Sequence, residues 1–364
     1  MKNNLTEKDI ENLNKWAEKY NIEELKIKDK EKIFNLEELH ITRHNLTELP
    51  KEIGILTNLK ILDIECFNLK ELPKEIFNLI NLEELHITIH NLTELPKEIG
   101  ILTNLKILDI EYYKLKELPR EIFNLINLEE LHITSHNLTE LPKEIGILTN
   151  LKILYIDCYN LKELPKEIFN LINLEELNIG SENLTELPKE IENLTNLKIL
   201  DICNNLKELP KEIFNLINLE ELDITSHNLT ELPKEIGNLI NLEKLYICNV
   251  NLIELPKELT ELPKEIGNLT NLKRLDIRTN NFTKLPKEIG NLINLEKLSI
   301  DCNNLEISPD GIEKLINLEK LYIEINIDIN IINKDFNFKS LPIKEIGKLN
   351  NLKDLSIRIR KWEK

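Results

Sequence analysis

The chain has 364 residues and a formal net charge of −17 at neutral pH. Nucleic acids and anionic membranes bind clustered basic side chains, so this charge disfavours both as partners. Ile, Asn, Lys and Glu are abundant, whereas there is a single Ala, a single Val and no Gln, which indicates an AT-rich coding bias. The presence of an Asn or Lys at a given position is therefore weaker evidence for a functional role than in a protein of average composition.

The first predicted element is an N-terminal helix over residues 5–20. Thr6 and Asp9 have the spacing of a capping box. One apolar face at helical spacing is formed by Ile10, Leu13, Trp16, Ala17 and Tyr20. We interpret residues 1–21 as a cap for the open end of the following domain. The segment lacks the apolar region of a signal peptide, and the chain has no run of about 18 apolar residues, so we expect a cytoplasmic protein without a membrane-spanning segment.

A 23-residue repeat follows the cap. Residues 36–58 read LEELHITRHNLTELPKEIGILTN, residues 59–81 read LKILDIECFNLKELPKEIFNLIN, and the frame starts again at Leu82, Leu105, Leu128, Leu151 and Leu174. A fixed period of this length indicates a solenoid, because one repeat cannot bury its apolar face alone. We therefore predict a single solenoid domain over residues 22–364.

Positions in the repeat are counted from its first leucine, so Leu36 is position 1. Apolar residues at positions 1, 4 and 6 predict a strand with one buried face. Proline at position 15 suits the start of a helical turn, and apolar residues at positions 18 and 21 have the i, i+3 spacing of that turn. The predicted fold is an α/β solenoid with about fifteen parallel strands on one side and short helical turns on the other.

The frame L-x-x-L-x-I…N-L-x-x-L-P-x-x-I-x-x-L resembles the leucine-rich repeat, in the intracellular 23-residue form of Ras-pathway scaffold proteins and many bacterial and protist proteins. The resemblance implies a horseshoe with a concave parallel sheet and a convex side of short helical turns. It also implies a protein partner, for which a small GTPase, a kinase or a phosphatase is the expectation.

Position 9 departs from this family, which usually has a buried Asn there. Six successive repeats instead carry His44, Phe67, His90, Tyr113, His136 and Tyr159, and Asn stands at position 10 in most of them. His227 follows the same departure, whereas Asn280 and Asn303 match the family. Either the turn is shifted by one residue, or aromatic rings replace the Asn ladder. The sequence leaves open whether these rings are buried or exposed.

Positions 2, 3, 5, 7 and 8 are predicted to be the exposed residues of the concave face. Position 2 alternates Glu and Lys from Glu37 onward, which predicts a structural ladder of ion pairs. Position 3 is acidic or Ile in early repeats and basic from Lys244 onward. This polarity would orient a charge-asymmetric partner, or it reflects drift of a duplicated pair of repeats.

Position 5 places His40, His86 and His132 in alternate repeats, with Asp63 and Asp109 between them. The histidines are about 10 Å apart, too far to share a metal ion, so we predict no metal site and no cofactor. Neighbouring carboxylates favour the protonated imidazole, which suggests that partner affinity changes between about pH 5 and 7. The five cysteines never fall in adjacent repeats, so no internal disulfide is expected.

Tyrosine and arginine dominate binding hot spots, and both types cluster at positions assigned to the concave face. We rank Tyr112 and Tyr155 above Tyr113 and Tyr159 as contacts. The predicted protein-binding residues are Tyr112, Tyr155, His132, Asp109, Tyr246, Arg274, Arg278 and Tyr322. Gly and Phe alternate at position 19, which predicts large-beside-small packing or, alternatively, an exposed row of phenylalanines.

Three repeats are irregular. The repeat from Leu197 is one residue short, the repeat from Leu242 contains the duplication ELPKELTELPKEIG, and the repeat from Leu318 is eleven residues longer. Residues 324–340 are predicted to add an extended segment. Trp362 is expected to cover the C-terminal end, unless the natural chain continues.

Signatures of nucleotide-binding loops, serine hydrolases and zinc proteases are absent from the sequence. We therefore predict a non-enzymatic protein-binding module, with a signalling scaffold as the main interpretation. The alternatives are the recognition part of a larger enzyme or pathogen effector, and an enzyme inhibitor.

Overall fold

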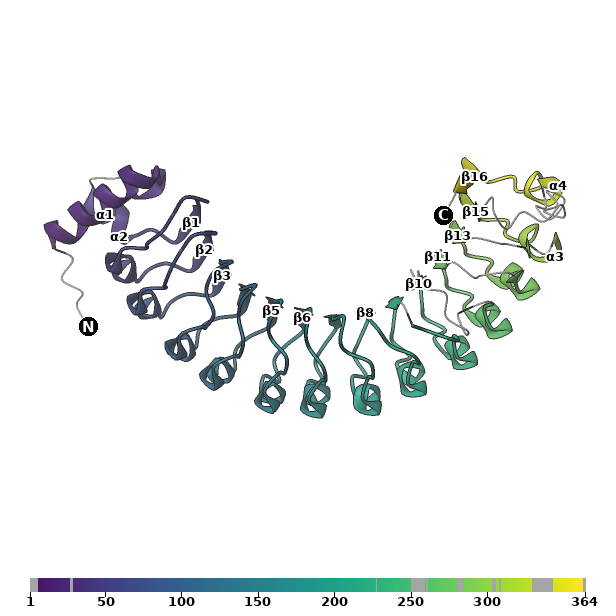
Figure 1. Ribbon diagram of the computed structural model, residues 1–364, viewed down its shortest axis with the longest axis horizontal. Coiled ribbons are helices and arrows are strands. Elements are labelled where there is room, and N and C mark those ends of the chain that lie inside the picture. Colours follow the sequence, from purple (N-terminus) through teal and green to yellow (C-terminus); the bar gives the residue numbers. More distant parts are fainter. Residues whose placement is uncertain are drawn as a thin grey trace. The chain divides into compact units, whose positions relative to one another are not determined.

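The computed structural model describes residues 6–26, 29–226, 228–249, 259, 261–279, 284–302, 306–307, 309–328 and 343–362. The chain divides into two compact units, Met1–Leu174 and Glu175–Lys364. Figure 1 shows the ribbon of both units, coloured along the sequence from purple to yellow. Both units are built from the repeat that the sequence predicts.

The first unit begins with helix α1 (Glu7–Tyr20), which confirms the predicted N-terminal helix. The Thr6 side chain accepts a hydrogen bond from the Asp9 amide, and the Asp9 carboxylate accepts one from the Thr6 amide, as in a capping box. Asn21 ends the helix in the left-handed conformation, with φ of 59°. The Trp16 indole donates to the Glu48 carbonyl at 3.0 Å, so the apolar face of α1 packs against the first repeat. The 3₁₀ turn η1 (Glu23–Leu25) and helix α2 (Lys30–Phe34) lead into that repeat.

Six parallel strands form the sheet of the first unit: β1 (Glu38–Thr42), β2 (Ile61–Glu65), β3 (Glu84–Thr88), β4 (Ile107–Glu111), β5 (Glu130–Ser135) and β6 (Ile153–Cys158). Neighbours pair in register, so that Leu39, Leu62 and Leu85 are successive partners. Each repeat returns through one 3₁₀ turn on the other side: η2 (Lys51–Ile55), η3 (Lys74–Asn78), η4 (Lys97–Ile101), η5 (Arg120–Asn124), η6 (Lys143–Ile147) and η7 (Lys166–Asn170). Figure 1 shows the strands on the inner side and these turns on the outer side.

Eight strands form the sheet of the second unit: β7 (Glu176–Gly180), β8 (Ile199–Asn204), β9 (Glu221–Ser226), β10 (Lys244–Asn249), β11 (Arg274–Thr279), β13 (Lys297–Cys302), β15 (Lys320–Asp328) and β16 (Asp354–Trp362). Its turns are η8 (Lys189–Asn193), η9 (Lys211–Asn215), η10 (Lys234–Asn238), η11 (Lys264–Asn268), η12 (Lys287–Asn291), α3 (Pro309–Ile312) and α4 (Ile343–Ile346). β12 (Lys284–Leu285) pairs with β14 (Glu306–Ile307) in a separate small sheet. The predicted fold class is confirmed, with fourteen parallel strands in the main sheet of the described residues where about fifteen were expected.

The core of both units consists of the leucines and isoleucines that define the repeat. Leu131, Ile133 and Leu138, at positions 4, 6 and 11 of one repeat, are fully buried. Proline precedes each of the 3₁₀ turns η2 to η12, as at Pro119 with φ of −65° and ψ of 137°, whereas Ile22 precedes η1. Its fixed φ and missing amide hydrogen suit the residue that starts a helical turn.

Asparagine at the last position of the repeat forms a ladder that the sequence analysis missed. The Asn58 amide donates to the Phe34 carbonyl at 3.0 Å, and Asn81 donates to the Thr57 carbonyl at 2.7 Å. The second unit has the same ladder, in which Asn294 donates to the Thr270 carbonyl at 2.8 Å. Each of these bonds satisfies a backbone carbonyl between the helical turn and the next strand. These asparagines are therefore structural, and coding bias does not explain them.

A second amide ladder runs along position 10. The Asn68 side chain donates to the His44 carbonyl, and the Asn91 side chain donates to the Phe67 carbonyl, both at 2.8 Å. The Asn ladder of the family is thus present but shifted by one residue. Because the Asn at position 10 makes the hydrogen bond to the backbone, the ring at position 9 takes no part in this ladder.

Glycine and phenylalanine at position 19 pack against each other between successive turns. Phe77, Phe123 and Phe169 are buried, so the alternative of an exposed phenylalanine row is wrong. A Cβ atom added to Gly54 would lie 2.1 Å from the Glu75 carbonyl oxygen in the following turn. In the first unit, the turns therefore approach closely in pairs, with a glycine turn before a phenylalanine turn.

Gly100→Ala is expected to destabilise the first unit by about 1–3 kcal/mol, although alanine usually favours helical turns. The added Cβ would lie 2.4 Å from the Glu121 backbone oxygen, which cannot move without distorting η5. Urea unfolding followed by circular dichroism measures the change. The control is Ile101→Ala on the next residue, whose side chain is 55% exposed. Equal stability of Gly100→Ala and the wild type would contradict the close packing.

Parts of several sequence predictions lie outside the described residues. These are the first half of the duplication after Ile253, residues 329–340 of the predicted extended segment, His227, Asn280, Asn303 and the Trp362 side chain. Residues 324–328 of the extended segment do form the end of β15, which pairs with β16 along its whole length.

Candidate protein-binding surface

Strand residues alternate between the core and the exposed sheet face. Positions 3, 5 and 7 face outward, whereas positions 4, 6 and 8 face the core, as in the burial pattern of β5. The assignment of position 8 to the exposed face is therefore wrong, because position 8 has the same parity as the buried positions 4 and 6. Its residues from the second repeat onward include buried Cys66, Ile89, Tyr112, Ser135 and Cys158.

Tyr112 is the residue for which this error matters most. Its side chain is fully buried, and this burial raises the pKa of its hydroxyl group. Within the described residues, the hydroxyl has no hydrogen-bond partner. Tyr112 therefore cannot contact a partner on the sheet face, and it acts as a core side chain.

The other predicted residues of the first unit do come together on the sheet face. Asp109, His132 and Tyr155 are successive partners in β4, β5 and β6. The His132 and Tyr155 rings lie 5.7 Å apart between centroids, and Tyr155 is 38% exposed. An aromatic ring, an imidazole and a carboxylate thus lie side by side on one exposed surface.

His86 lies in the same row, two strands before His132. Its Nδ1 atom is 3.7 Å from the Asp109 carboxylate. Hydrogen bonding to Asp109 raises the pKa of His86, and the charges of Asp63 and Glu84 act in the same direction. His40 makes a similar contact, with Nδ1 at 3.4 Å from Asp63.

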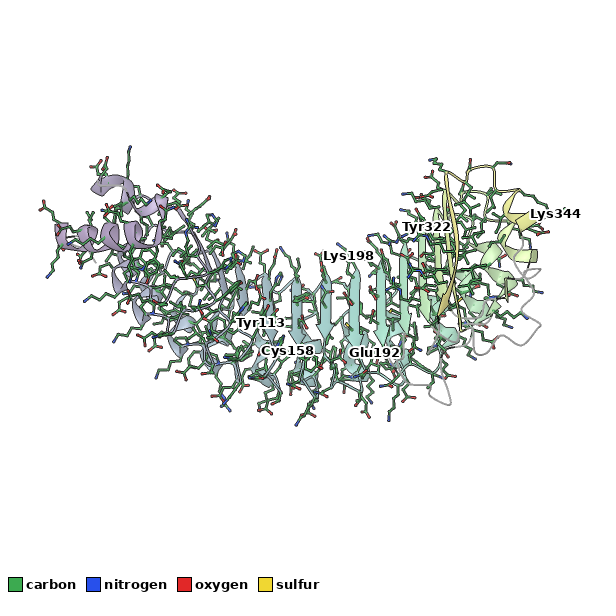
Figure 2. All side chains as sticks on the ribbon, turned by 45° about the horizontal axis from the view of Figure 1, so that its top comes forward. Tyr113, Cys158, Glu192, Lys198, Tyr322 and Lys344 are labelled. Carbon is green, nitrogen blue, oxygen red and sulfur yellow. The ribbon has the colours of Figure 1, made fainter. Side chains whose placement is uncertain are left out.

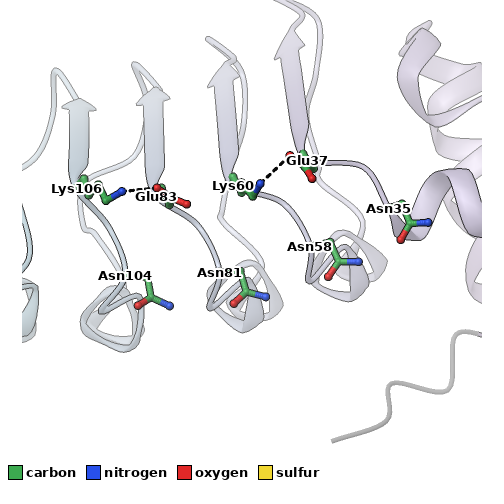
Figure 3. A pocket seen from close by; sticks show the side chains of 8 residues that line it. All are labelled: Asn35, Glu37, Asn58, Lys60, Asn81, Glu83, Asn104 and Lys106. Atoms are coloured by element: carbon green, nitrogen blue, oxygen red, sulfur yellow. Dashed lines mark hydrogen bonds and ion pairs between the residues drawn. The ribbon is translucent and has the colours of Figure 1, made fainter.

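The charge ladder at position 2 is confirmed. Lys60 pairs with Glu37 at 2.8 Å, and Lys106 pairs with Glu83 at 2.6 Å. Between this ladder and the last-position asparagines runs an open polar hollow of about 540 Å³ (Figure 3). It is lined by Asn35, Glu37, Asn58, Lys60, Asn81, Glu83, Asn104 and Lys106. The charged side chains that line the hollow already pair with each other. We therefore interpret the hollow as a consequence of the repeat structure.

The position-9 rings form a stack along the edge of the sheet in the first unit. Ring centroids are 4.3 Å apart for His44 and Phe67, 4.1 Å for Phe67 and His90, and 4.3 Å for His90 and Tyr113. His136 continues the stack 4.7 Å beyond Tyr113 at an interplanar angle of 2°. These rings are exposed or half-buried, so the open question about position 9 is answered.

Tyr159 is tilted by 57° at the end of this aromatic stack and is 53% exposed. The Tyr113 hydroxyl donates to Glu111 at 2.7 Å. Tyr113 and Tyr159 are therefore more exposed than Tyr112, which is the opposite of the predicted ranking. Figure 2 labels Tyr113 and also Cys158, the last residue of β6 and the neighbour of Tyr159.

The second unit brings together the later predicted residues. The Arg274 guanidinium lies over the Tyr246 ring at 4.8 Å, and its Nε atom pairs with Asp276 at 2.6 Å. Arg278 pairs with Asp301 at 3.4 Å. The hydroxyl of Tyr322, which is labelled in Figure 2, donates to Asp354 at 2.5 Å. All four predicted residues lie on the sheet strands β10, β11 and β15.

Comparison with known proteins identifies the family. The family described as "Leucine-rich repeat region" matches residues 124–204, 168–258 and 251–364, and "BspA type Leucine rich repeat region (6 copies)" matches residues 32–145. The chain belongs to the leucine-rich repeat family. Leucine-rich repeats generally form non-enzymatic surfaces for protein interaction. A search of curated proteins found no match.

Solved structures support the same assignment. A leucine-rich repeat protein of Leptospira interrogans is 34% identical, with a TM-score of 0.66, over 90% of this chain and 86% of that one. The internalin InlF of Listeria monocytogenes shares the fold at 20% identity, with a TM-score of 0.68, over 95% of this chain and 94% of that one. The plant peptide hormone receptor RGFR1, solved in complex with RGF2, is 26% identical, with a TM-score of 0.59, over 89% of this chain and 55% of the receptor.

The leucine-rich repeat face of the second unit also contains an acidic pair that the sequence analysis did not single out. Asp201 and Asp223 are register partners in β8 and β9. Burial, together with the charge of Asp223, raises the pKa of Asp201 to about 6. Register pairing of two carboxylates on adjacent strands was visible in the sequence as Asp at position 5 of two successive repeats.

Asp201→Asn is expected to stabilise this leucine-rich repeat unit at pH 7.5. The fold raises the pKa of Asp201 from 3.8 to about 6, so the native state favours the protonated carboxyl group. The stability that this group contributes is fully present below about pH 4 and is lost as the pH rises through 6. Asn cannot ionise, so the urea midpoint should increase at pH 7.5 and stay unchanged at pH 4. An equal increase at both pH values would contradict the electrostatic cause.

Two further results concern the described residues alone. Among them, no group of three or more His, Cys, Asp or Glu side chains could hold a metal ion. No helix in this part of the chain is long and apolar enough to cross a membrane.

Proposed function

We propose that this leucine-rich repeat protein is a non-enzymatic scaffold that holds a protein partner on the exposed sheet face of its units. The observation that carries the proposal is the row Asp109, His132 and Tyr155 on adjacent strands. Tyrosine with neighbouring polar groups is typical of binding hot spots. The similar plant receptor RGFR1, which was solved with its hormone, supports a polypeptide as the ligand class.

Three more specific expectations from the sequence remain predictions. They are the Ras-pathway type of repeat, the cytoplasmic location and the partner class of small GTPase, kinase or phosphatase. The proposal of a sheet-face site does not depend on them.

The test of the proposal is affinity capture from the source organism, with crosslinking and mass spectrometry to identify the bound protein. Tyr155→Ala is then expected to weaken that partner by about tenfold or more, because truncating a central aromatic contact costs over 1 kcal/mol. Biolayer interferometry with the purified partner measures the change.

Two matched variants locate the site. Tyr159→Ala removes the same side chain from the aromatic stack, and Ile147→Ala removes an exposed apolar side chain from turn η6. Both should leave the affinity within about twofold of the wild type. Loss of binding with Tyr159→Ala but not with Tyr155→Ala would move the site from the sheet face to its edge.

A further inference from the structure

A column of four basic side chains crosses the sheet of the second unit. Lys244, Arg274, Lys297 and Lys320 occupy position 3 of β10, β11, β13 and β15, and each is the register partner of the next. Parallel neighbours lie about 4.8 Å apart, so the column is about 14 Å long. Like charges directly beside each other are unfavourable in a sheet. A run of four is therefore unexpected in a chain with a net charge of −17.

The neighbouring carboxylates compensate this basic column only in part. Lys244 pairs with Glu221 at 2.8 Å. Arg274 and Lys297 share one carboxylate, Asp276, at 2.6 and 3.4 Å. Lys320 is exposed and forms no ion pair within 4.0 Å among the described residues, although its register partner on β16 is Asp354, whose carboxylate accepts a hydrogen bond from Tyr322. The column thus has more positive charge than its own contacts neutralise.

Two tyrosines at position 5 border the basic column. Arg274 lies 4.8 Å from the Tyr246 ring centroid, and Lys297 lies 5.7 Å from that of Tyr322. These cation–π contacts restrict the basic side chains before any ligand binds. A surface that is already ordered loses less entropy on binding.

The spacing indicates the geometry of a ligand. Alternate residues of an extended peptide point to one side and are about 6.8 Å apart, so three of them span about 14 Å. This length matches the basic column. Acidic residues at i, i+2 and i+4 of an extended segment would therefore all lie over basic side chains.

The strands beside the column set the direction of such a segment. Glu176, Asp201, Glu221 and Asp223 lie on the outward face of β7, β8 and β9. They repel further acidic residues on that side and attract a basic one. The same carboxylates disfavour nucleic acid, whose charge is negative along its whole length.

We propose that the sheet face over β10, β11, β13 and β15 binds an extended acidic peptide segment of the pattern Glu-x-Glu-x-Glu, with a basic residue at the end nearest β8 and β9. This inference rests on the proposed function, because it names the kind of partner that the second unit would hold. It is independent of the row around Tyr155, which belongs to the first unit.

The test uses the full chain and fluorescein-labelled synthetic peptides in fluorescence anisotropy titrations at 50 and 150 mM salt. A peptide with Glu-x-Glu-x-Glu and two lysines at one end is compared with the same peptide carrying Gln for Glu. A single-stranded DNA of similar charge serves as the competitor. The Glu peptide should bind at least about tenfold more tightly than the Gln peptide. Its affinity should fall with salt.

Two variants with the same change of charge locate the binding. Lys320→Gln is expected to weaken the Glu peptide by about tenfold, because it removes an exposed basic residue of the column. Lys264→Gln, on the outer turn η11 of the repeat that precedes Arg274, should change the affinity by less than about twofold. Circular dichroism confirms that both variants are folded.

The inference is overturned if the Glu and Gln peptides bind equally or not at all, if both variants weaken binding equally, or if the DNA competes better than the Glu peptide. If the Glu peptide does not bind while Tyr155→Ala still lowers the affinity for a captured protein, the proposed role of the basic column is wrong and the scaffold proposal stands. If Tyr155→Ala has no effect while the peptide binds as predicted, the site in the first unit is wrong and this one stands.

Discussion

Leu131→Asp is expected to unfold several repeats of the first unit together. Leu131 is fully buried in β5, between its register partners Leu108 and Leu154. A carboxylate at this place would lose its hydration without gaining a partner, which costs several kcal/mol. Because each repeat is stabilised by its neighbours, the loss extends to the repeats on both sides.

Urea unfolding followed by far-UV circular dichroism and by Trp16 fluorescence measures this effect. Trp16 reports on the first unit, since it packs between the cap and the first repeat. The matched control is Glu130→Asp, which places the same aspartate side chain on the preceding residue of β5, whose side chain faces outward. We expect a loss above about 4 kcal/mol for Leu131→Asp and below about 1 kcal/mol for the control. A native-like melting curve for Leu131→Asp would contradict the inward direction of position 4.

Tyr112→Ala is expected to cost about 3–5 kcal/mol of unfolding free energy, because it removes a large buried ring from a close-packed core. Tyr155→Ala, two strands later on the sheet face, should cost less than about 1 kcal/mol. The two substitutions are chemically identical, so the difference isolates the effect of burial. Urea unfolding of both variants under the same conditions measures it.

Tyr112→Phe separates the role of the ring from that of the hydroxyl. The ring stays in place, and a buried hydroxyl without a partner in the described residues is removed, so stability should equal or exceed that of the wild type. If Tyr112→Ala were as stable as Tyr155→Ala, the ring would lie outside the core. If Tyr112→Phe were strongly destabilised, the hydroxyl would have a partner.

The fold could be predicted from the sequence because the same pattern of strand and turn residues recurs in every repeat. Leu39 and Ile41 alternate with polar residues, and Pro50 marks the start of the turn. The error at Tyr112 was avoidable, since a period of two puts position 8 on the same side as positions 4 and 6.

Other features of the structure could not be predicted from a single sequence. Asn58 is chemically the same whether it reflects codon usage or satisfies a carbonyl, and the hydrogen bond to Phe34 decides between them. The stacking of Phe67 between His44 and His90 depends on side-chain angles at the end of a strand, which periodicity does not determine. The sharing of Asp276 by Arg274 and Lys297 likewise depends on contacts between residues far apart in the chain.

The alternation of glycine and phenylalanine turns has a consequence for how such a chain can change its length. Deletion of residues 82–104 would place the turn of Phe77 directly before that of Phe123 and set Lys60 beside Lys106. Deletion of residues 82–127 would leave Phe77 before Gly146 and Lys60 before Glu129, so the alternation at positions 2 and 19 is preserved. In the first unit the building block is therefore the pair of repeats, and deletions or duplications there should be tolerated in steps of 46 residues rather than 23.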